Sequence, residues 1–139
     1  MAAQITFDSV QTGQQLPGLT IPITASLIVA GAIATSDYSL VHHDKAHAQA
    51  AGTPDIFMNI LTSNGLVQRF VHDWAGPGAR IRSLKMRLGA PNFPGDALRL
   101  SGTVTTREVI GKEKIVEVAV SGRNRLGEHV TATVRLALP

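Results

Sequence analysis

The sequence has no cysteine among its 139 residues. This absence excludes disulfide bonds and thiolate metal ligands, and it fits a reducing compartment. Histidine is the remaining strong metal ligand, but His47, His72 and His129 are scattered along the chain and have no carboxylate or histidine at ligand spacing. The sequence therefore predicts no metal site.

Long apolar runs are also missing. The longest run, ASLIVAGAIA at 25–34, has ten residues, whereas a membrane-spanning helix needs about 20. The N-terminal stretch MAAQITFDSV lacks a basic region leading into an apolar run, so it shows no secretory signal. We therefore expect a cytoplasmic protein with no membrane span.

Aromatic residues are few, with four Phe, one Tyr and one Trp. The net charge of +3 invites a polyanionic partner, but most Lys and Arg residues are dispersed over residues 69–135 with acidic residues between them. Nucleic acid is bound by clustered basic residues and stacked aromatic rings, so we expect no nucleic-acid partner. A mildly basic surface equally suits a small phosphorylated ligand, and a polyanion-binding module stays open as an alternative.

The chain does contain enough apolar residues for one core. Hydrophobic residues make up 44% and charged residues 17% of the sequence, which is typical of a globular protein. A chain of this length buries roughly 68% of the surface that its unfolded form exposes. With no repeat and no low-complexity segment, we expect a single domain over residues 1–139.

The first half of the chain predicts an extended segment followed by helices. Residues 1–23 are rich in turn-forming and β-branched residues and favour the extended form. Residues 25–35 form an apolar run that is compatible with a helix or a buried strand. Residues 44–52 predict a short helix with Asp44 as its N-cap and a glycine at its end. Residues 56–74 predict the long helix of the chain.

Apolar side chains recur in the long helix at three- to four-residue spacing. The predicted stripe consists of Ile56, Ile60, Val67, Val71 and Trp74, widened by Phe57, Leu61 and Phe70. After the GPG break, apolar and polar residues alternate, which is the period of half-buried strands. Strands are predicted over 80–88, 98–104, 116–121 and 130–138, with hairpin turns at 108–114 and 122–128. The expected fold class is α+β, a curved antiparallel sheet of at least four strands wrapped around a long central helix.

Residues 36–44 read SDYSLVHHD and place two histidines side by side, five and six positions after Asp37. One interpretation is a polar turn at the surface, because charged loop residues are usually solvated. The other is an acid–base pair, because a loop of this length between two helices can bring both side chains to one point. The spacing alone leaves both interpretations open.

Four short motifs follow one another along the chain: DYSLVHHD (37–44), AAG (50–52), MNILT (58–62) and APNFPGD (90–96). In order and spacing they resemble the MaoC-like (R)-specific enoyl-CoA hydratases. The resemblance implies the hot-dog fold and hydration of a trans-2-enoyl-CoA. Two positions depart from the family pattern: Ser39-Leu40 stands where the family commonly has Asn-Pro, and Met58-Asn59 where it has His-Gly.

Longer phrases resemble one branch of that family, the small catalytic hydratase subunit of bacterial steroid side-chain degradation. They are VHHD (41–44), DIFMNILT (55–62), GLVQR (65–69), DWAGP (73–77) and GRNRLGEHVTATV (122–134). This likeness implies a steroid side-chain acyl-CoA as substrate and a second hot-dog subunit in a heterodimer or heterotetramer. A homodimer stays open, because either arrangement covers the exposed edges of a sheet.

The resemblance also assigns roles to residues. Asp37 and His42 activate water and transfer the proton, while His43 is a neighbour and Asp44 a helix cap. The backbone N–H of Asn59 is the expected oxyanion donor. The resemblance implies no cofactor besides the coenzyme A thioester of the substrate. The CoA phosphates are expected to meet some of Arg80, Arg82, Lys85, Arg87, Arg123 and Arg125.

Two alternatives share the fold. A thioesterase of this fold usually carries a carboxylate on or beside the long helix, and residues 56–72 contain no Asp or Glu. A non-catalytic or structural partner subunit should have lost Asp37 or His42, and both are present. The sequence therefore favours a hydratase over either alternative.

Overall fold

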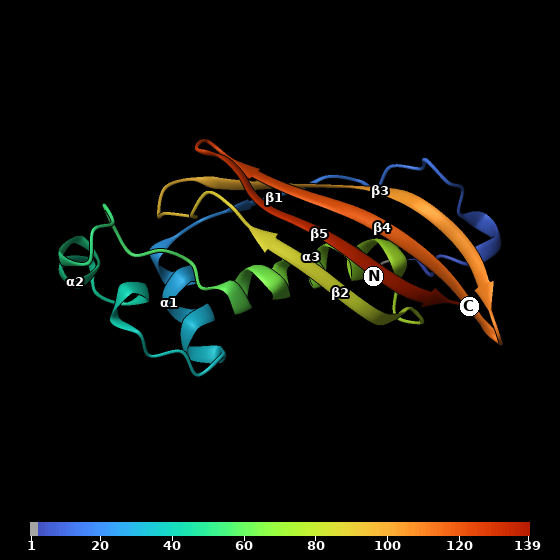
Figure 1. The fold of residues 1–139 in the computed structure, drawn as a ribbon, viewed down its shortest axis with the longest axis horizontal. Coiled ribbons are helices and arrows are strands. Elements are labelled where there is room, and N and C mark those ends of the chain that lie inside the picture. Colours follow the sequence, from blue (N-terminus) through green and yellow to red (C-terminus); the bar gives the residue numbers. More distant parts are fainter. Residues whose placement is uncertain (1–2) are drawn as a thin grey trace.

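The computed structural model describes residues 3–139. In chain order the elements are β1 (Leu19–Pro22), α1 (Ala25–Ala34), α2 (Lys45–Ala50), α3 (Ile60–Ala75), β2 (Arg80–Leu88), β3 (Ala97–Ile110), β4 (Glu113–Asn124) and β5 (Gly127–Leu138), with short 3₁₀ turns at Phe7–Ser9 and Leu40–His42. The strands form one arched sheet with α3 along its inner side, and α1 and α2 gather at one end (Figure 1).

The sheet has the strand order β1-β3-β4-β5-β2, and all neighbouring strands are antiparallel. One edge is covered by β1 and by the segment before it, where Leu16 N–H donates to Gly102 O at 2.9 Å and Gly13 N–H to Val104 O at 2.8 Å. The other edge is β2, whose outer side has no strand partner within residues 3–139. The two edges therefore differ in length, because β1 has four residues and β2 has nine.

The core lies between α3 and the inner face of the sheet. Removing these apolar side chains from water is the main stabilising contribution. Gly102 allows the helix to approach β3, because a Cβ at this position would stand 3.0 Å from Cε1 of Phe70. The α+β prediction is confirmed, with five strands in the sheet. Buried core residues include Leu66, Val67, Phe70 and Val71 of α3 and Val118, Val120, Val134 and Leu136 of the strands.

The helix α3 begins at Ile60 and not at residue 56, so the predicted start is wrong. Asn59 has extended backbone angles, φ −77° and ψ 161°, and its side chain caps the helix. Phe57 lies outside the helix, and its N–H donates to Val41 O at 3.3 Å. A periodic apolar pattern cannot reveal that the backbone before the cap is bonded elsewhere.

In the first turn of α3, burial is the reverse of what the apolar stripe predicts. Ile60 and Leu61 are 54% and 52% exposed, whereas the polar Thr62 and Ser63 are buried. Thr62 packs against Gly31 of α1 and bonds to Asn59, while Ser63 bonds to His129 of β5. Polar groups are thus satisfied inside while the apolar ones face outward. The remainder of the helix buries its apolar side, as predicted.

The hairpin turns are tighter than predicted. The strands extend to a two-residue turn at 111–112 and another at 125–126. Gly111 and Gly127 have φ of +61° and +129°, a conformation that favours glycine at these two positions. Gly122 is different, because it lies inside β4, where a Cβ would collide with side chains of the neighbouring strands. Its role is close packing and not turning.

The run at 25–35 is the helix α1, and Thr24 caps it by accepting the N–H of Leu27 at 3.0 Å. The short helix α2 is confirmed. Its predicted N-cap, Asp44, accepts the backbone N–H three residues later at 3.0 Å, and Gly52 follows the helix with φ of +104°. No helix within residues 3–139 combines the length and the hydropathy that crossing a bilayer requires.

Candidate functional site

The candidate site lies where α1, the segment after it and the first turn of α3 meet, at one end of the sheet (Figure 1). α1 ends at Ala34, and Ser36 takes a left-handed conformation with φ of +56°. The chain thereby reverses, and Asp37 N–H donates back to Ala32 O at 2.9 Å. This turn sets where the Asp37 carboxylate leaves the end of α1.

Asp37 and His42 come together, as the spacing allowed. The 3₁₀ turn over residues 40–42 brings Nε2 of His42 to 3.3 Å from Oδ2 of Asp37. The His42 side chain is 9% exposed and the Asp37 side chain 29% exposed. The pair is therefore accessible from solvent mainly through the carboxylate.

The imidazole of His42 is anchored through Nδ1, which lies 2.6 Å from the carbonyl oxygen of Phe57. A carbonyl oxygen only accepts, so Nδ1 carries the proton and donates it. The Phe57 ring meets the imidazole edge-on, with 4.9 Å between the ring centroids. Nε2 is thereby left as the nitrogen that faces Asp37 and can exchange a proton.

Hydrogen bonds favour the ionised form of Asp37. Asn59 Nδ2 donates to Oδ2 at 3.1 Å, and Ser39 N–H donates to Oδ1 at 3.1 Å. The Asn59 hydrogen bond lowers the pKa of Asp37 most, the Ser39 bond comes next, and burial opposes them. Positive charge on His42 or His43 lowers this pKa further. The carboxylate is accordingly an acceptor at neutral pH.

His43 takes a different place from His42. Its Nε2 lies 2.8 Å from the backbone carbonyl oxygen of Asp37, which ties the loop together and does not touch the carboxylate. The side chains of Asp37 and His42 thus face each other. His43 contacts only the backbone of Asp37, so it is a neighbour of the pair.

Asn59 is 2% exposed and lies directly against the pair. Its Oδ1 caps α3 by accepting Thr62 N–H at 2.9 Å, while its Nδ2 donates to Asp37. The resemblance pointed only to the backbone N–H of this residue, so the role of its side chain was missed. The available signal was an Asn directly before an apolar helical run, which is the pattern of an N-cap.

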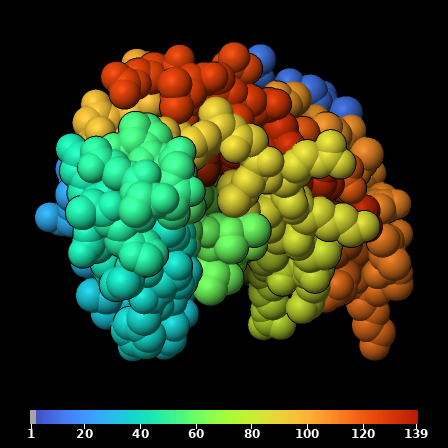
Figure 2. Space-filling model, turned by 60° about the vertical axis from the view of Figure 1, so that its left-hand side comes forward, coloured from blue at the N-terminus to red at the C-terminus, as the bar shows by residue number. Residues whose placement is uncertain are grey.

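A notch separates the lobe that carries α1 and α2 from the strand β2, and the start of α3 forms its floor (Figure 2). Large apolar side chains are exposed on the elements around this notch. They are Ile33 (53%), Tyr38 (69%), Leu40 (50%), Ile60 (54%) and Leu61 (52%). Exposed apolar side chains on these elements are available to contact an apolar ligand or a partner.

A second buried histidine lies on the other side of the α3 start. His129 is 2% exposed, its Nδ1 donates to Ala90 O at 2.6 Å, and its Nε2 accepts from Ser63 Oγ at 2.8 Å. Burial lowers the pKa of His129, and the bond to Ala90 only partly opposes this. No partner of His129 was visible in the sequence, because Ser63 is 66 residues away along the chain. Within residues 3–139 no three metal-ligating side chains lie together.

The basic residues predicted for CoA do not form one group. Arg80 and Arg82 begin β2, beside the last residues of β5, and Arg82 pairs with Glu113. This end of β2 is remote from α1 and α2 (Figure 1). The structure therefore does not bring these two residues together with Asp37.

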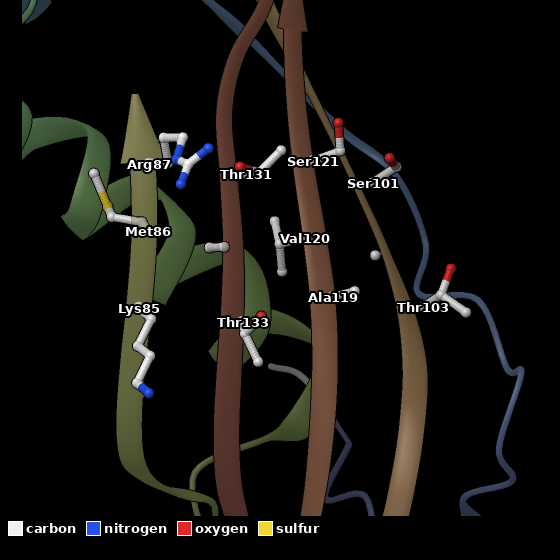
Figure 3. A pocket seen from close by; sticks show the side chains of 12 residues that line it. Lys85, Met86, Arg87, Ser101, Thr103, Ala119, Val120, Ser121, Thr131 and Thr133 are labelled. Atoms are coloured by element: carbon white, nitrogen blue, oxygen red, sulfur yellow. The ribbon is translucent and has the colours of Figure 1, made fainter. Parts of the chain in front are cut away.

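Lys85 and Arg87 lie on the outer face of the sheet, since the alternate residues Leu84, Met86 and Leu88 pack against the core. Both cationic side chains border a shallow hollow of about 670 Å³ that small hydroxyl side chains of the neighbouring strands line (Figure 3). The sheet itself separates this hollow from α3.

Arg123 and Arg125 lie at the site end of the molecule. They flank Asn124, whose Nδ2 donates to Asn92 Oδ1 at 2.8 Å. The carbonyl oxygen of Asn92 in turn accepts Met58 N–H at 3.1 Å, one residue before Asn59. Among the six basic candidates, these two are tied by a chain of contacts to the start of α3.

Comparison with known proteins gives a family and a full-length relative. The family described as "MaoC like domain" matches residues 8–124. The 3-oxo-4,17-pregnadiene-20-carboxyl-CoA hydratase beta subunit of Mycobacterium tuberculosis (strain ATCC 25618 / H37Rv) is 48% identical over 126 residues, which cover 91% of this chain and 95% of that relative.

Solved structures agree with the family match. One chain of the ChsH1–ChsH2 complex from Mycobacterium tuberculosis superimposes with a TM-score of 0.86 at 47% identity, covering 93% of this chain and 98% of that chain. The R-hydratase PhaJ1 from Pseudomonas aeruginosa also reaches 0.86, at 22% identity, covering 98% and 86%. At the lower identity the likeness concerns the fold alone.

Proposed function

This chain belongs to the MaoC-like domain family and has the hot-dog fold, and from that premise we propose that it hydrates a trans-2-enoyl-CoA thioester to the 3-hydroxyacyl-CoA. The supporting observation is the Asp37–His42 pair, 3.3 Å apart beside the start of α3. Hydration needs a base for water, a proton for C2 and a donor for the thioester oxygen. The pair supplies the first two.

The geometry of the pair suits activation of one water molecule. Because Nδ1 of His42 holds its proton against Phe57, Nε2 of the neutral ring is an acceptor, and Oδ2 of ionised Asp37 is another. One water can donate to both and direct a lone pair at C3. As the C3–O bond forms, the water O–H bond breaks toward the pair, and the pair delivers a proton to C2.

We assign the oxyanion role to the backbone N–H of Asn59. This N–H stands at the N-terminus of α3, where backbone donors and the helix dipole point outward. None of the hydrogen bonds within residues 3–139 uses it. Negative charge that builds on the thioester oxygen is therefore stabilised by a donor that no group within residues 3–139 occupies.

The substrate class that we propose is a steroid side-chain acyl-CoA. The name of the Mycobacterium tuberculosis relative includes a pregnadiene-20-carboxyl-CoA. The exposed apolar side chains around the notch offer contact area to a bulky apolar acyl group. For the CoA phosphates, Arg123 and Arg125 are the candidates that their position supports, and the other four basic residues stay predictions.

We further propose a second hot-dog subunit as partner, in a heterodimer or heterotetramer. A related chain occurs in the ChsH1–ChsH2 complex, and β2 presents an open edge of nine residues in the part of the chain that the structure describes. Unpaired backbone groups along an edge favour association with another strand. A homodimer through the same edge is the alternative.

The test is to purify the chain alone and co-expressed with its genomic neighbour, measure the mass of each assembly, and follow hydration of steroid and short linear enoyl-CoA thioesters. Asp37→Asn should lower kcat/KM by about 10²- to 10⁴-fold, the usual contribution of a general acid–base group. Gln49→Ala, an exposed change on α2, is the control. Full activity of Asp37→Asn would refute the assignment.

A thioesterase is less well supported. The only acid in α3 is Asp73, in its last turn, where it is 60% exposed and pairs with Arg69 at 3.5 Å. No α3 carboxylate therefore reaches Asp37. The same substrates decide the matter, because a thioesterase releases free CoA thiol whereas a hydratase only removes the conjugated double bond.

A further inference from the structure

The side-chain carboxamide of Asn59 makes four polar contacts, none of which involves the backbone N–H of this residue. Its Oδ1 accepts from the N–H of Thr62 at 2.9 Å and from the Thr62 hydroxyl at 2.5 Å. Its Nδ2 donates to Thr35 Oγ1 at 2.9 Å and to Asp37 Oδ2 at 3.1 Å. The residue is 2% exposed, so protein groups replace water around the carboxamide.

Donor and acceptor chemistry fixes which end of the carboxamide faces Asp37. The Thr62 N–H can only donate, so it must meet Oδ1, and an ionised carboxylate can only accept, so it must meet Nδ2. The single proton of the Thr35 hydroxyl points to Gly31 O at 2.9 Å and Ala32 O at 3.0 Å, which leaves a lone pair for Nδ2. A flipped amide would lose these matches.

The carboxamide is braced by both helices. A Cβ on Gly31 would stand 2.8 Å from Thr62 Cγ2 and closer still to its hydroxyl, so α1 and α3 touch there with no side chain between them. Asn59 bonds to α3 through Thr62 and to the end of α1 through Thr35. Its third partner, Asp37, is therefore held relative to two packed helices and not only by its own loop.

The carboxylate of Asp37 is clamped from two sides. Oδ1 takes Ser39 N–H, while Oδ2 takes Asn59 Nδ2 and faces His42 Nε2. The titratable groups that act on this carboxylate are His42 and His43, and Asn59 adds a donor without adding a charge. Two fixed donors determine the plane of the carboxylate and keep Oδ2 toward the imidazole.

We propose that the side chain of Asn59 is a positioning residue, which orients the Asp37 carboxylate toward His42 and holds it as the ionised acceptor for water. The inference rests on the proposed hydratase function. It concerns the carboxamide alone, at a position where the family pattern has glycine and hence no side chain. The carboxamide acts through Asp37 and does not touch the reacting atoms.

Two variants separate this role from helix capping, because Ser and Asp are both good N-caps. Asn59→Ser keeps an acceptor for Thr62 N–H and removes the donor to Asp37. Asn59→Asp keeps the acceptor and places a second carboxylate against Asp37. Gln68→Ala, which deletes an exposed amide from the same helix, is the matched control.

The readouts are the titration of the Asp37 carboxyl by carbon NMR in the intact assembly and steady-state hydration kinetics. In Asn59→Ser the pKa of Asp37 rises, since the donor that lowers it most is lost. kcat falls about 10-fold in Asn59→Ser and about 100-fold in Asn59→Asp, while KM stays within about 2-fold because ground-state binding is untouched. The acidic limb of the kcat/KM profile moves up together with the Asp37 titration.

If the titration of Asp37 is unchanged in both variants, the proposal is overturned, whatever happens to kcat. A lower kcat without a shifted Asp37 titration would show that only the helix-capping role of Asn59 was lost. Circular dichroism establishes that each variant is folded. A wild-type assembly that hydrates no enoyl thioester overturns the proposed function instead. In that case the Asp37 titration still decides whether Asn59 holds the carboxylate.

Discussion

His42 and His129 are both buried and are anchored in the same way, yet they differ in what they can do. Each donates from Nδ1 to a backbone carbonyl oxygen at 2.6 Å. Nε2 of His42 faces the partly exposed carboxylate of Asp37, whereas Nε2 of His129 accepts from the buried hydroxyl of Ser63. The same anchor thus serves two different second partners.

The group that faces Nε2, and the exposure of that group to water, distinguish a histidine suited to catalysis from a structural one. Nε2 of His42 lies beside a partly exposed carboxylate, which is the arrangement that the proposed proton transfer needs. A hydroxyl cannot compensate a buried charge, and burial lowers the pKa of His129, so this ring stays neutral and links α3 to β5. A buried histidine is therefore judged by what its free nitrogen meets.

The largest expected effect is the loss of hydration activity on removing His42. His42→Ala should lower kcat/KM by about 10²- to 10⁴-fold, because the proton acceptor for water is lost. The control is His47→Ala, an exposed change on α2. Steady-state hydration of an enoyl-CoA measures both variants. Equal rates for His42→Ala and wild type would erase the distinction between the two buried histidines.

His129→Ala should instead act on stability, by about 3 kcal/mol, because it leaves a cavity and strips the Ser63 hydroxyl and the Ala90 carbonyl of their partner. Urea denaturation measures the free energy of unfolding. Turnover per folded molecule should remain close to that of the wild type. A stable His129→Ala protein with a 100-fold lower kcat would instead place His129 in the chemistry.

Gly31→Ala tests how far the His42 side depends on the contact between α1 and α3. A methyl group at this position meets Thr62, so we expect a loss of about 1–3 kcal/mol from overpacking. Gly65→Ala is the matched helical control. No atom lies within 4 Å of its Cβ, so the better helix former should add about 0.5–1 kcal/mol. Equal unfolding free energies for the two variants would contradict this close contact.

The smallest effect is the pH dependence that His129 contributes. Its pKa is lowered in the folded protein from 6.5, so well above pH 6.5 it is neutral in both states and adds no pH dependence. As the pH falls below 6.5 the unfolded chain takes up the proton first, and stability is lost until the folded state also titrates. The unfolding free energies of wild type and His129→Gln, measured from pH 8 to pH 5, should therefore converge. Parallel curves would show that His129 is not buried neutral.

Several features of the site were predictable because they depend on residues close in sequence. The cap of α2 by Asp44 and the meeting of Asp37 with His42 involve separations of three and five residues. The relation of Ser63 to His129 spans 66 residues, and that of Asn59 to Asp37 spans 22. No local pattern encodes such pairs, because packing brings them together.

The sequence by itself determined the fold class and the four long strands, since alternation and helical spacing act over a few residues. Its resemblance to the MaoC-like hydratases, and not the spacing alone, singled out Asp37 and His42 as the candidate acid–base pair. Only the tertiary structure decided where α3 begins, that Ile60 and Leu61 face outward, and that the Asn59 side chain holds Asp37. The physical reason is that burial and hydrogen-bond satisfaction are set by neighbours distant in the chain. The burial of a polar residue on the apolar side of a helix can be explained only when those neighbours are known.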